Sequence, residues 1–210
     1  MKNLIYFISI ILLFSCQKEE KITILDCEDN PRHGVCLNEE MIIDDSTQVP
    51  MFQPGNTEKG FVSGIKSNQP WEASIFSFGI DNFLSGDNFF AGFNTLSDEG
   101  FCRESIFLQV IPRKIGCYPL ELSGSSFPRN EIPTISYTLL GDDGDVFIGS
   151  YSLNPVHRDS NLIEITEIDT INRKVYGRLA ASFFLADTSI NRLHPNFIRL
   201  FNCEIEATYE

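Results

Sequence analysis

The chain has 210 residues, with 16 Lys and Arg against 29 Asp and Glu, so its formal net charge is −13 at pH 7. That charge argues against a nucleic-acid binder, because such proteins need a basic surface to displace counterions from phosphates. A hydrophobic share of 42% is enough for a packed core and argues against wholesale disorder. The length suits one or two domains.

The N-terminus carries the pattern of an export signal. Lys2 supplies a positive charge, and an almost unbroken apolar run follows over residues 4–14. A helix of that length rises about 16 Å, roughly half of the ~30 Å hydrocarbon core, so the run is too short for a permanent span. A buried helix is the alternative, but the run has no amphipathic pattern. We expect residues 1–15 to be a signal peptide.

The residues that follow resemble a bacterial lipobox. Leu13 and Ser15 precede Cys16 as the aliphatic and small residues do in that pattern, although Phe14 is bulkier than the usual residue at its position. The resemblance implies cleavage before Cys16 and lipidation of Cys16. The membrane anchor would then be acyl chains rather than a helix.

The residues directly after Cys16 resemble the surface-export tag of Bacteroidetes lipoproteins, and they are Gln17, Lys18, Glu19 and Glu20. The resemblance implies a protein on the outer face of the outer membrane. The alternative is a plain solvated tether that leaves the protein facing the periplasm. Residues 16–60 contain acidic clusters, Pro and Gly with little periodicity, so we interpret them as a lipidated tether and lead-in segment.

Two cysteines lie in this lead-in segment. Cys27 and Cys36 bracket a loop with Pro31 and Gly34, and an exported protein can keep disulfides. A bridge closing this loop would contribute roughly 2–3 kcal/mol. Metal binding with His33 lacks a fourth ligand, so a disulfide is the better interpretation.

Three more cysteines lie in the body of the chain. Cys102 and Cys117 flank two candidate strands joined near residues 112–114, so they are candidates to face each other across a hairpin. Cys203 lies on an apolar face. It is either a buried free thiol or a partner of Cys102 or Cys117, and the sequence leaves this open.

From residue 61 onward the dominant pattern is alternation with period two, which is typical of strands. The candidate strands are 71–78, 89–96, 105–111, 118–122, 134–140, 146–153, 162–168, 175–185 and 197–207. Turn residues separate them, most clearly at 141–144. In the last strand one face is expected to hold Phe197, Phe201, Cys203, Ile205 and Ala207. The sequence predicts one all-β domain over 61–210, an antiparallel sandwich or barrel.

Residues 161–185 resemble a recurring pattern in small Bacteroidetes lipoproteins, in which a strand ending in Ile-Thr is followed by a turn and a Val-x-Gly-x-Phe strand. Residues 71–73 and 116–120 resemble earlier elements of the same pattern, while Leu179 stands where it has Phe. The family is one of uncharacterised surface or envelope lipoproteins. The resemblance therefore implies architecture and location, not chemistry. Gly177 inside a strand suits a bulge or a close neighbouring backbone.

Motifs for catalysis, metals or cofactors are absent from the sequence. The three histidines, His33, His157 and His194, are too scattered for a metal site or a triad. An acidic cluster of Asp142, Asp143 and Asp145 could offer oxygens to Ca²⁺, but a hairpin tip explains it without a metal. We therefore expect no catalytic residues, metal or cofactor.

Two further features leave alternatives open. Glu204 and Glu206 share a strand face and could form the carboxylate pair of a glycosidase, although a solvated outer face is the simpler interpretation. The Phe-rich segment 78–93 could line the pocket of a lipocalin-like carrier, or it could fill the core. Trp71 is the sole Trp available as a sugar platform.

The sequence thus predicts a non-catalytic binding or structural module on the outer membrane. Its partners would be the membrane, through the lipid anchor, and an extracellular ligand or envelope protein, but not nucleic acid. A carrier of small apolar ligands is the first alternative, and a hydrolase acting on extracellular polymers is the second.

Overall fold

The computed structural model describes residues 51–81, 87–122, 132–144, 146–186 and 195–209. Its strands are β1 (Gln53–Pro54), β2 (Gly60–Lys66), β3 (Gln69–Asp81), β4 (Asn88–Leu96), β5 (Cys102–Pro112), β6 (Gly116–Pro119), β7 (Glu121–Leu122), β8 (Thr134–Leu140), β9 (Phe147–Leu153), β10 (Leu162–Asp169), β11 (Lys174–Leu185) and β12 (Phe197–Thr208). A short 3₁₀ helix, η1 (Pro155–Ser160), joins β9 to β10. Within these ranges no helix has the length and apolar character needed to cross a membrane.

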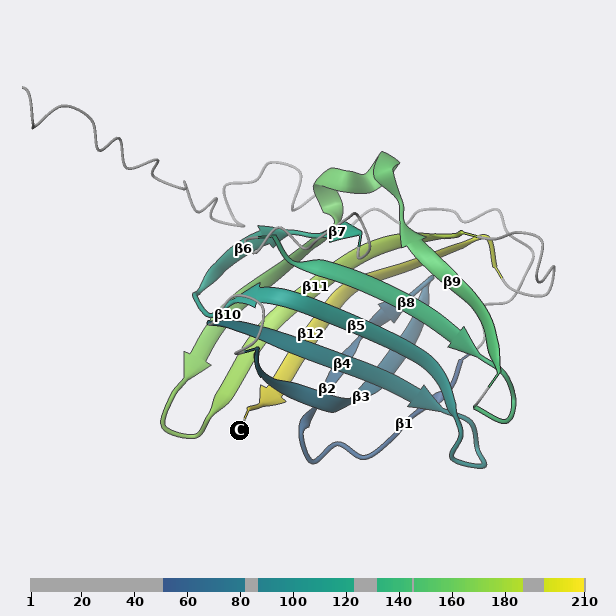
Figure 1. Ribbon diagram of the computed structural model, residues 1–210, viewed down its shortest axis with the longest axis horizontal. Coiled ribbons are helices and arrows are strands. Elements are labelled where there is room, and N and C mark those ends of the chain that lie inside the picture. Colours follow the sequence, from purple (N-terminus) through teal and green to yellow (C-terminus); the bar gives the residue numbers. More distant parts are fainter. Residues whose placement is uncertain (1–50, 82–86, 123–131, 145, 187–194, 210) are drawn as a thin grey trace, which may run out of the picture.

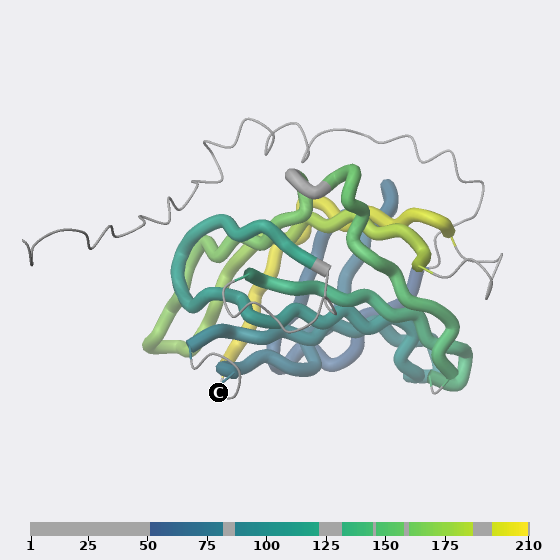
Figure 2. The backbone as a smooth tube through the Cα atoms, turned by 45° about the horizontal axis from the view of Figure 1, so that its top comes forward, coloured from purple at the N-terminus to yellow at the C-terminus, as the bar shows by residue number. Residues whose placement is uncertain are grey.

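Eight of the strands close into an antiparallel barrel. Hydrogen-bonded neighbours follow the order β12-β2-β3-β4-β5-β8-β9-β11, and β11 pairs with β12 to complete the ring. In Figure 1, β4, β5 and β8 run side by side in front of β11 and β12, and Figure 2 shows the first strands beside the last one. The predicted all-β, barrel-like domain is confirmed. The prediction left a sandwich or a barrel open, and the closed ring of strands is a barrel.

Four strands lie outside the ring: β1 and β7 are two-residue strands that pair with β4 and β8, and β10 and β6 extend the sheet from β11. β11 has 12 residues, so one of its edges can pair with two strands. Residues 183–185 pair with β9, and residues 174–180 pair with β10. β6 then pairs with the free edge of β10. The chain therefore leaves the ring after β5 and returns to it at β8.

The interior is filled by the inward-pointing residues of the strands, as the period of two predicts. The bulkiest side chains that are fully buried are Trp71, Tyr137, Lys66, Phe89, Phe93 and Phe183. Aromatic rings pack across the neighbouring strands β8, β9 and β11, with centroid distances of 5.1 Å for Tyr137–Tyr151 and 5.3 Å for Tyr137–Phe183. These distances lie in the favourable range for ring pairs. A barrel of eight strands is narrow enough for side chains to fill it.

The hairpin between β8 and β9 forms where the sequence predicted the clearest turn. The N–H of Gly141 donates to the carbonyl of Val146 at 2.7 Å. Gly144 has φ +75°, a conformation that favours glycine.

The hairpin between β10 and β11 also follows the predicted turn chemistry. Asp169 Oδ1 accepts the N–H groups of Ile171 and Asn172, each at 2.9 Å. These hydrogen bonds, with that of Asn172 the strongest, lower the pKa of the Asp169 carboxyl. Gly177 is needed because a side chain there would meet the carbonyl oxygen of Glu164 at 2.5 Å, beside a bulge in β10. The predicted role of Gly177 is confirmed.

The first half of β12 departs from the predicted pattern. A bulge at Asn202, which has φ 50°, shifts the alternation by one residue. Ile198 and Leu200 are therefore buried, whereas Phe197 is exposed and Phe201 is half-buried. A single extra residue moves every side chain before it to the other face, so the prediction for this half was wrong.

The sheet also begins earlier than expected. β1 pairs with Thr95 and Leu96 of β4, although it falls within residues 16–60, which we interpreted as tether and lead-in segment. A strand of two residues is too short to show alternation, so the period-two pattern cannot predict it.

Candidate functional site

A polar cluster lies inside the barrel. It consists of Lys66 of β2, Trp71 of β3, Thr95 of β4, Glu104 of β5 and Tyr137 of β8. These strands are successive neighbours in the ring, and each contributes one inward-pointing residue. Each of the five residues is at most 2% exposed. We call this group the interior cluster.

Glu104 is the centre of the interior cluster. Its Oε1 accepts from Lys66 Nζ at 2.6 Å and from the hydroxyl of Tyr137. Its Oε2 accepts from Thr95 Oγ1 at 2.7 Å and from Trp71 Nε1 at 3.2 Å. A carboxylate offers about four lone-pair positions, so these donors saturate it. Buried charge is tolerated when it is paired and hydrogen-bonded in this way.

The interior cluster is therefore suited to holding strands together rather than to catalysis. Burial raises the pKa of Tyr137 well above its ordinary value, and the charge of Glu104 and the hydrogen bond to it act in the same direction. Tyr137 thus stays a neutral donor at physiological pH. The ring of Phe52 lies 5.8 Å from Lys66 Nζ and 4.8 Å from the guanidinium carbon of Arg103, so it lies close to this end of the barrel.

Outside the barrel, the strands β10, β11 and β12 present a charged face. Cross-strand neighbours on it alternate in sign, as in the row formed by Glu164, Arg178 and Glu204. Lys174 Nζ donates to Glu206 Oε1 at 2.6 Å, and this bond raises the pKa of Lys174. Opposite charges on adjacent strands stabilise the sheet modestly.

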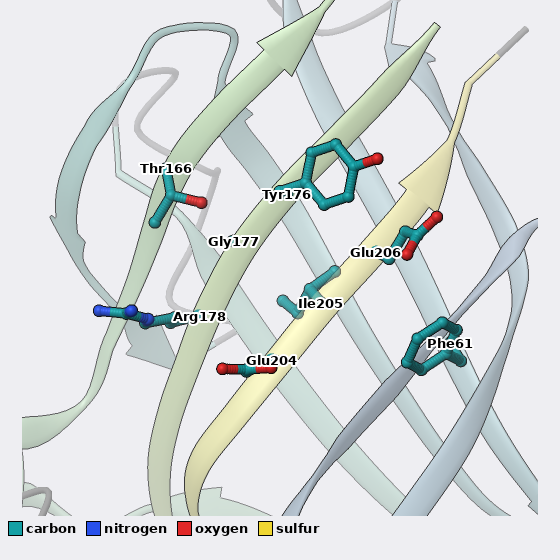
Figure 3. A pocket seen from close by; sticks show the side chains of 8 residues that line it. All are labelled: Phe61, Thr166, Tyr176, Gly177, Arg178, Glu204, Ile205 and Glu206. Atoms are coloured by element: carbon teal, nitrogen blue, oxygen red, sulfur yellow. The ribbon is translucent and has the colours of Figure 1, made fainter. Parts of the chain in front are cut away.

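A depression of about 200 Å³ lies on this charged face (Figure 3). Its lining residues are Phe61, Thr166, Tyr176, Gly177, Arg178, Glu204, Ile205 and Glu206. Glu204 and Glu206 both lie on the outer face, as the simpler interpretation predicted. Because Glu206 is paired with Lys174 and Glu204 lies opposite Arg178, the two acids are not poised as an acid and nucleophile pair.

The outer side of β3, β4, β5, β8 and β9 has a different composition. Its mid-strand residues are Phe76, Phe90, Gly92, Asn94, Ser105, Phe107, Gln109, Ser136, Thr138, Leu140, Ser150 and Ser152. None of them is charged, and we call them the neutral face. The remaining outward charges on these strands, Glu72, Asp81 and Arg103, lie near strand ends.

Cross-strand pairing places these residues side by side. One row runs from Asn94 to Ser105, Thr138 and Ser150, and all four lie on neighbouring strands. A parallel row runs from Gly92 to Phe107 and Ser136. The register thus builds a continuous surface of hydroxyl, amide and aromatic groups.

Two phenylalanine rings of the neutral face lie against glycines. A Cβ on Gly92 would be 2.5, 2.8 and 3.0 Å from the three tip atoms of the Phe76 ring. Such nearly equal distances mean that the face of the ring, not its edge, covers Gly92. A Cβ on Gly79 would be 3.0 Å from the tip of the Phe90 ring, and the Phe90 and Phe107 centroids are 6.2 Å apart. A side chain at either glycine would displace the ring that now lies against it.

The expected bridge between Cys102 and Cys117 is not formed. Cys102 is a half-buried free thiol and Cys203 is a buried one. Cys117 is not a free thiol, and its bonding partner is therefore neither of these two. The prediction was wrong because β6, which contains Cys117, pairs with β10 instead of folding back on β5. Burial raises the pKa of Cys203 to about 12, and burial followed by the charge of Glu104 raises that of Cys102.

The lipidation and export residues, Cys16 and 17–20, lie outside the described residues, and so do Cys27 and Cys36. Lipidation, export and a bridge in the lead-in segment all stay predictions.

The described acidic residues at the tip of the β8–β9 hairpin pair with nearby protein groups. Asp142 pairs with Arg103 at 2.6 Å, and Asp143 accepts the N–H of Val146 at 3.2 Å. Asp145 lies outside the described residues.

Of the histidines, His157 lies in η1, while His33 and His194 fall outside the described residues. Over the ranges that the structure describes, no three His, Cys, Asp or Glu side chains gather into a possible metal site.

The Phe-rich segment splits between two environments. Phe78, Phe89 and Phe93 are buried in the core, whereas Phe90 belongs to the neutral face. Trp71 is buried in the interior cluster and is not a sugar platform. The neutral face was not predicted, although a signal was present: the mid-strand outward positions of five strands lack charge in a strongly acidic chain.

Comparisons of the chain with protein-family models, with curated proteins and with solved structures found no match.

Proposed function

We propose that the protein is a lipid-anchored outer-membrane protein, exposed on the cell surface, whose barrel is a non-catalytic binding module. The observation that carries the binding role is the neutral face. Phe76 is 46% exposed there, and the same face carries a row of uncharged hydrogen-bonding groups, Asn94, Ser105 and Thr138. Folding does not require a sheet exterior to be free of charge, so a surface of this kind indicates a ligand. The lipobox-like residues 13–16 and the tag-like residues 17–20 support the location.

The state of the carboxylates supports a non-catalytic role. Glu104 has four donors and no free acceptor position, and Glu206 is held by Lys174. An acid–base catalyst needs a carboxyl group that can exchange a proton with its substrate. Neither of these acids is available for that exchange.

A carrier of small apolar ligands is the second candidate, because a closed barrel of eight strands can hold one small ligand. At the level of Glu104, however, the interior is occupied by charged and hydrogen-bonded side chains. A fluorescent fatty acid should therefore not be bound in the barrel. Saturable binding that the buried substitution Phe93→Ala alters would favour the carrier instead.

The location is tested in the native host. An alkynyl fatty acid should label the wild-type protein but not a Cys16→Ser variant, and protease added to intact cells should release the barrel. Absence of label would contradict the lipid anchor. Cleavage that occurs only after the outer membrane is permeabilised would place the protein on the periplasmic side.

A further inference from the structure

The charge of the neutral face restricts its ligand. The chain as a whole carries −13, so a polyanion is repelled before it reaches any surface of the protein. A basic partner would be attracted to acids such as Glu164 and Glu204 on the charged face, and not to a surface without charge. The ligand that fits the neutral face is therefore itself uncharged.

The phenylalanine rings provide platforms of fixed orientation. One face of the Phe76 ring is covered by Gly92, so its other face is available to a ligand. Phe90 is held by Gly79 and lies 6.2 Å from Phe107. The π face of a ring is electronegative and attracts the electropositive C–H groups of a pyranose ring. Because these rings are already held in place, binding costs little side-chain entropy.

Hydrogen-bonding groups border the platforms. Ser105, Gln109 and Ser136 lie on β5 and β8 beside Phe107, and their side chains make no hydrogen bond within the part of the chain that the structure describes. A hydroxyl or an amide both donates and accepts, as a sugar hydroxyl does. Alternating ring faces and uncharged polar groups match the alternating apolar and hydroxylated surfaces of a sugar.

The same pattern disfavours a protein partner. The centre of a stable protein interface is rich in contiguous apolar side chains. Here Phe90 and Phe107 contact each other, but Ser105, Gln109 and Ser136 border Phe107. The aliphatic Leu140 lies at the far end of β8. We infer that the neutral face binds a neutral polysaccharide, with Phe76, Phe90 and Phe107 as stacking platforms. This inference rests on the proposed binding role and names its ligand class.

The test is affinity electrophoresis of the full-length protein in mild detergent. The gels contain a neutral glucan, mannan or xyloglucan, or acidic polygalacturonate for comparison. We expect at least one neutral polymer, but not polygalacturonate, to retard the protein. Phe76→Ser and Phe107→Ser should each weaken this binding about tenfold, as loss of a central aromatic contact does. The matched control is Phe197→Ser, because Phe197 is 45% exposed on β12, opposite Phe184 of β11, and should not affect binding.

A second variant moves a platform without removing it. Gly92→Ala places a methyl group where the Phe76 ring now lies, so the ring must move and binding should weaken with all three phenylalanines present. The inference is overturned if no neutral polymer retards the protein, if polygalacturonate does so equally, or if Phe197→Ser weakens binding as much as Phe107→Ser. It is also overturned if the protein is a dimer that Phe107→Ser dissociates.

These outcomes are separate from those for the proposed location. A protein that is labelled at Cys16 and cleaved on intact cells, yet binds no neutral polymer, would overturn the ligand class alone. A protein that binds glycan but lacks the label would overturn the anchor alone.

Discussion

The interior of the barrel and its neutral face reverse the common placement of charge. Lys66 and Glu104 are almost completely shielded from water, whereas the outward residues of the neutral face, which contact water, carry no charge. Inside, a charge is stable because every atom of it has a partner. Outside, a charge would cost little, so its absence over several strands is not explained by folding.

The comparison teaches that polar residues in this fold have two separable roles. The interior cluster determines whether the barrel forms, and the neutral face determines what the formed barrel contacts. Substitutions in the two regions should therefore change different measurements.

The largest effect is expected inside the barrel. Lys66→Met leaves the Glu104 carboxylate buried without its cation, so we expect the free energy of unfolding to fall by about 3–5 kcal/mol. Chemical denaturation of the full chain measures this. The double variant Lys66→Met, Glu104→Gln should recover part of the loss, because no charge is left unpaired. If the loss of stability in the double variant instead equals the sum of the losses in Lys66→Met and Glu104→Gln, the two residues are not coupled.

Removing one neutral donor should have a smaller effect. Tyr137→Phe deletes the hydroxyl that donates to Glu104 Oε1 but keeps the ring contacts with Tyr151 and Phe183. We expect a loss of about 1–3 kcal/mol, since one lone pair of a buried carboxylate becomes unsatisfied. A matched Tyr151→Phe variant removes a hydroxyl that donates to the carbonyl of Pro195 instead. Equal losses of stability in both variants would mean that the hydrogen bond to the Glu104 carboxylate is no stronger than the one to the carbonyl of Pro195.

Alkaline pH should lower the free energy of unfolding, because the pKa values of two interior groups are both raised. Burial raises the pKa of Cys203 from 9.0 to about 12, and the pKa of Tyr137 is also raised. Above pH 9 the unfolded chain loses the thiol proton while the folded barrel keeps it, so the stability present below pH 9 is lost progressively up to about pH 12. Unfolding curves at about pH 7, 9 and 11 measure this. Cys203→Ala should reduce the dependence, and an unchanged slope would exclude the thiol as its source.

The smallest effect on stability is expected on the outer faces. Phe76→Ser on the neutral face and Phe197→Ser on β12 should each reduce the free energy of unfolding by about 1 kcal/mol or less, as exposed cross-strand contacts do. Thermal melts of the two variants measure this. If the two variants melt at the same temperature but only Phe76→Ser weakens glycan binding, the neutral face acts in binding and not in folding. A large destabilisation by Phe76→Ser alone would show instead that the neutral face is part of the folding core.

Much of the strand structure was predictable because it depends on local alternation. The turn at Asp169 and the need for glycine at position 177 were predictable for the same reason, since turn and bulge chemistry is written in a few adjacent residues. The bulge at Asn202 was not, because an extra residue in one strand is visible only against its neighbour.

The candidate sites were less predictable. No spacing in the sequence relates Lys66 to Glu104 or Phe76 to Gly92, because each pair is brought together by the order of strands in the ring. The error over Cys102 and Cys117 has the same origin, since nearness in sequence was taken for nearness in space.

By itself, the sequence determined that the body of the chain is made of strands, and it determined where most of them turn, because side-chain alternation and turn residues act over a few neighbours. Tertiary structure alone decided that β11 and β12 close the ring, that four distant residues donate to one buried carboxylate, and that uncharged residues of five strands form one surface. These outcomes depend on strand order and register, which are set by long-range pairing and by the packing of the whole interior.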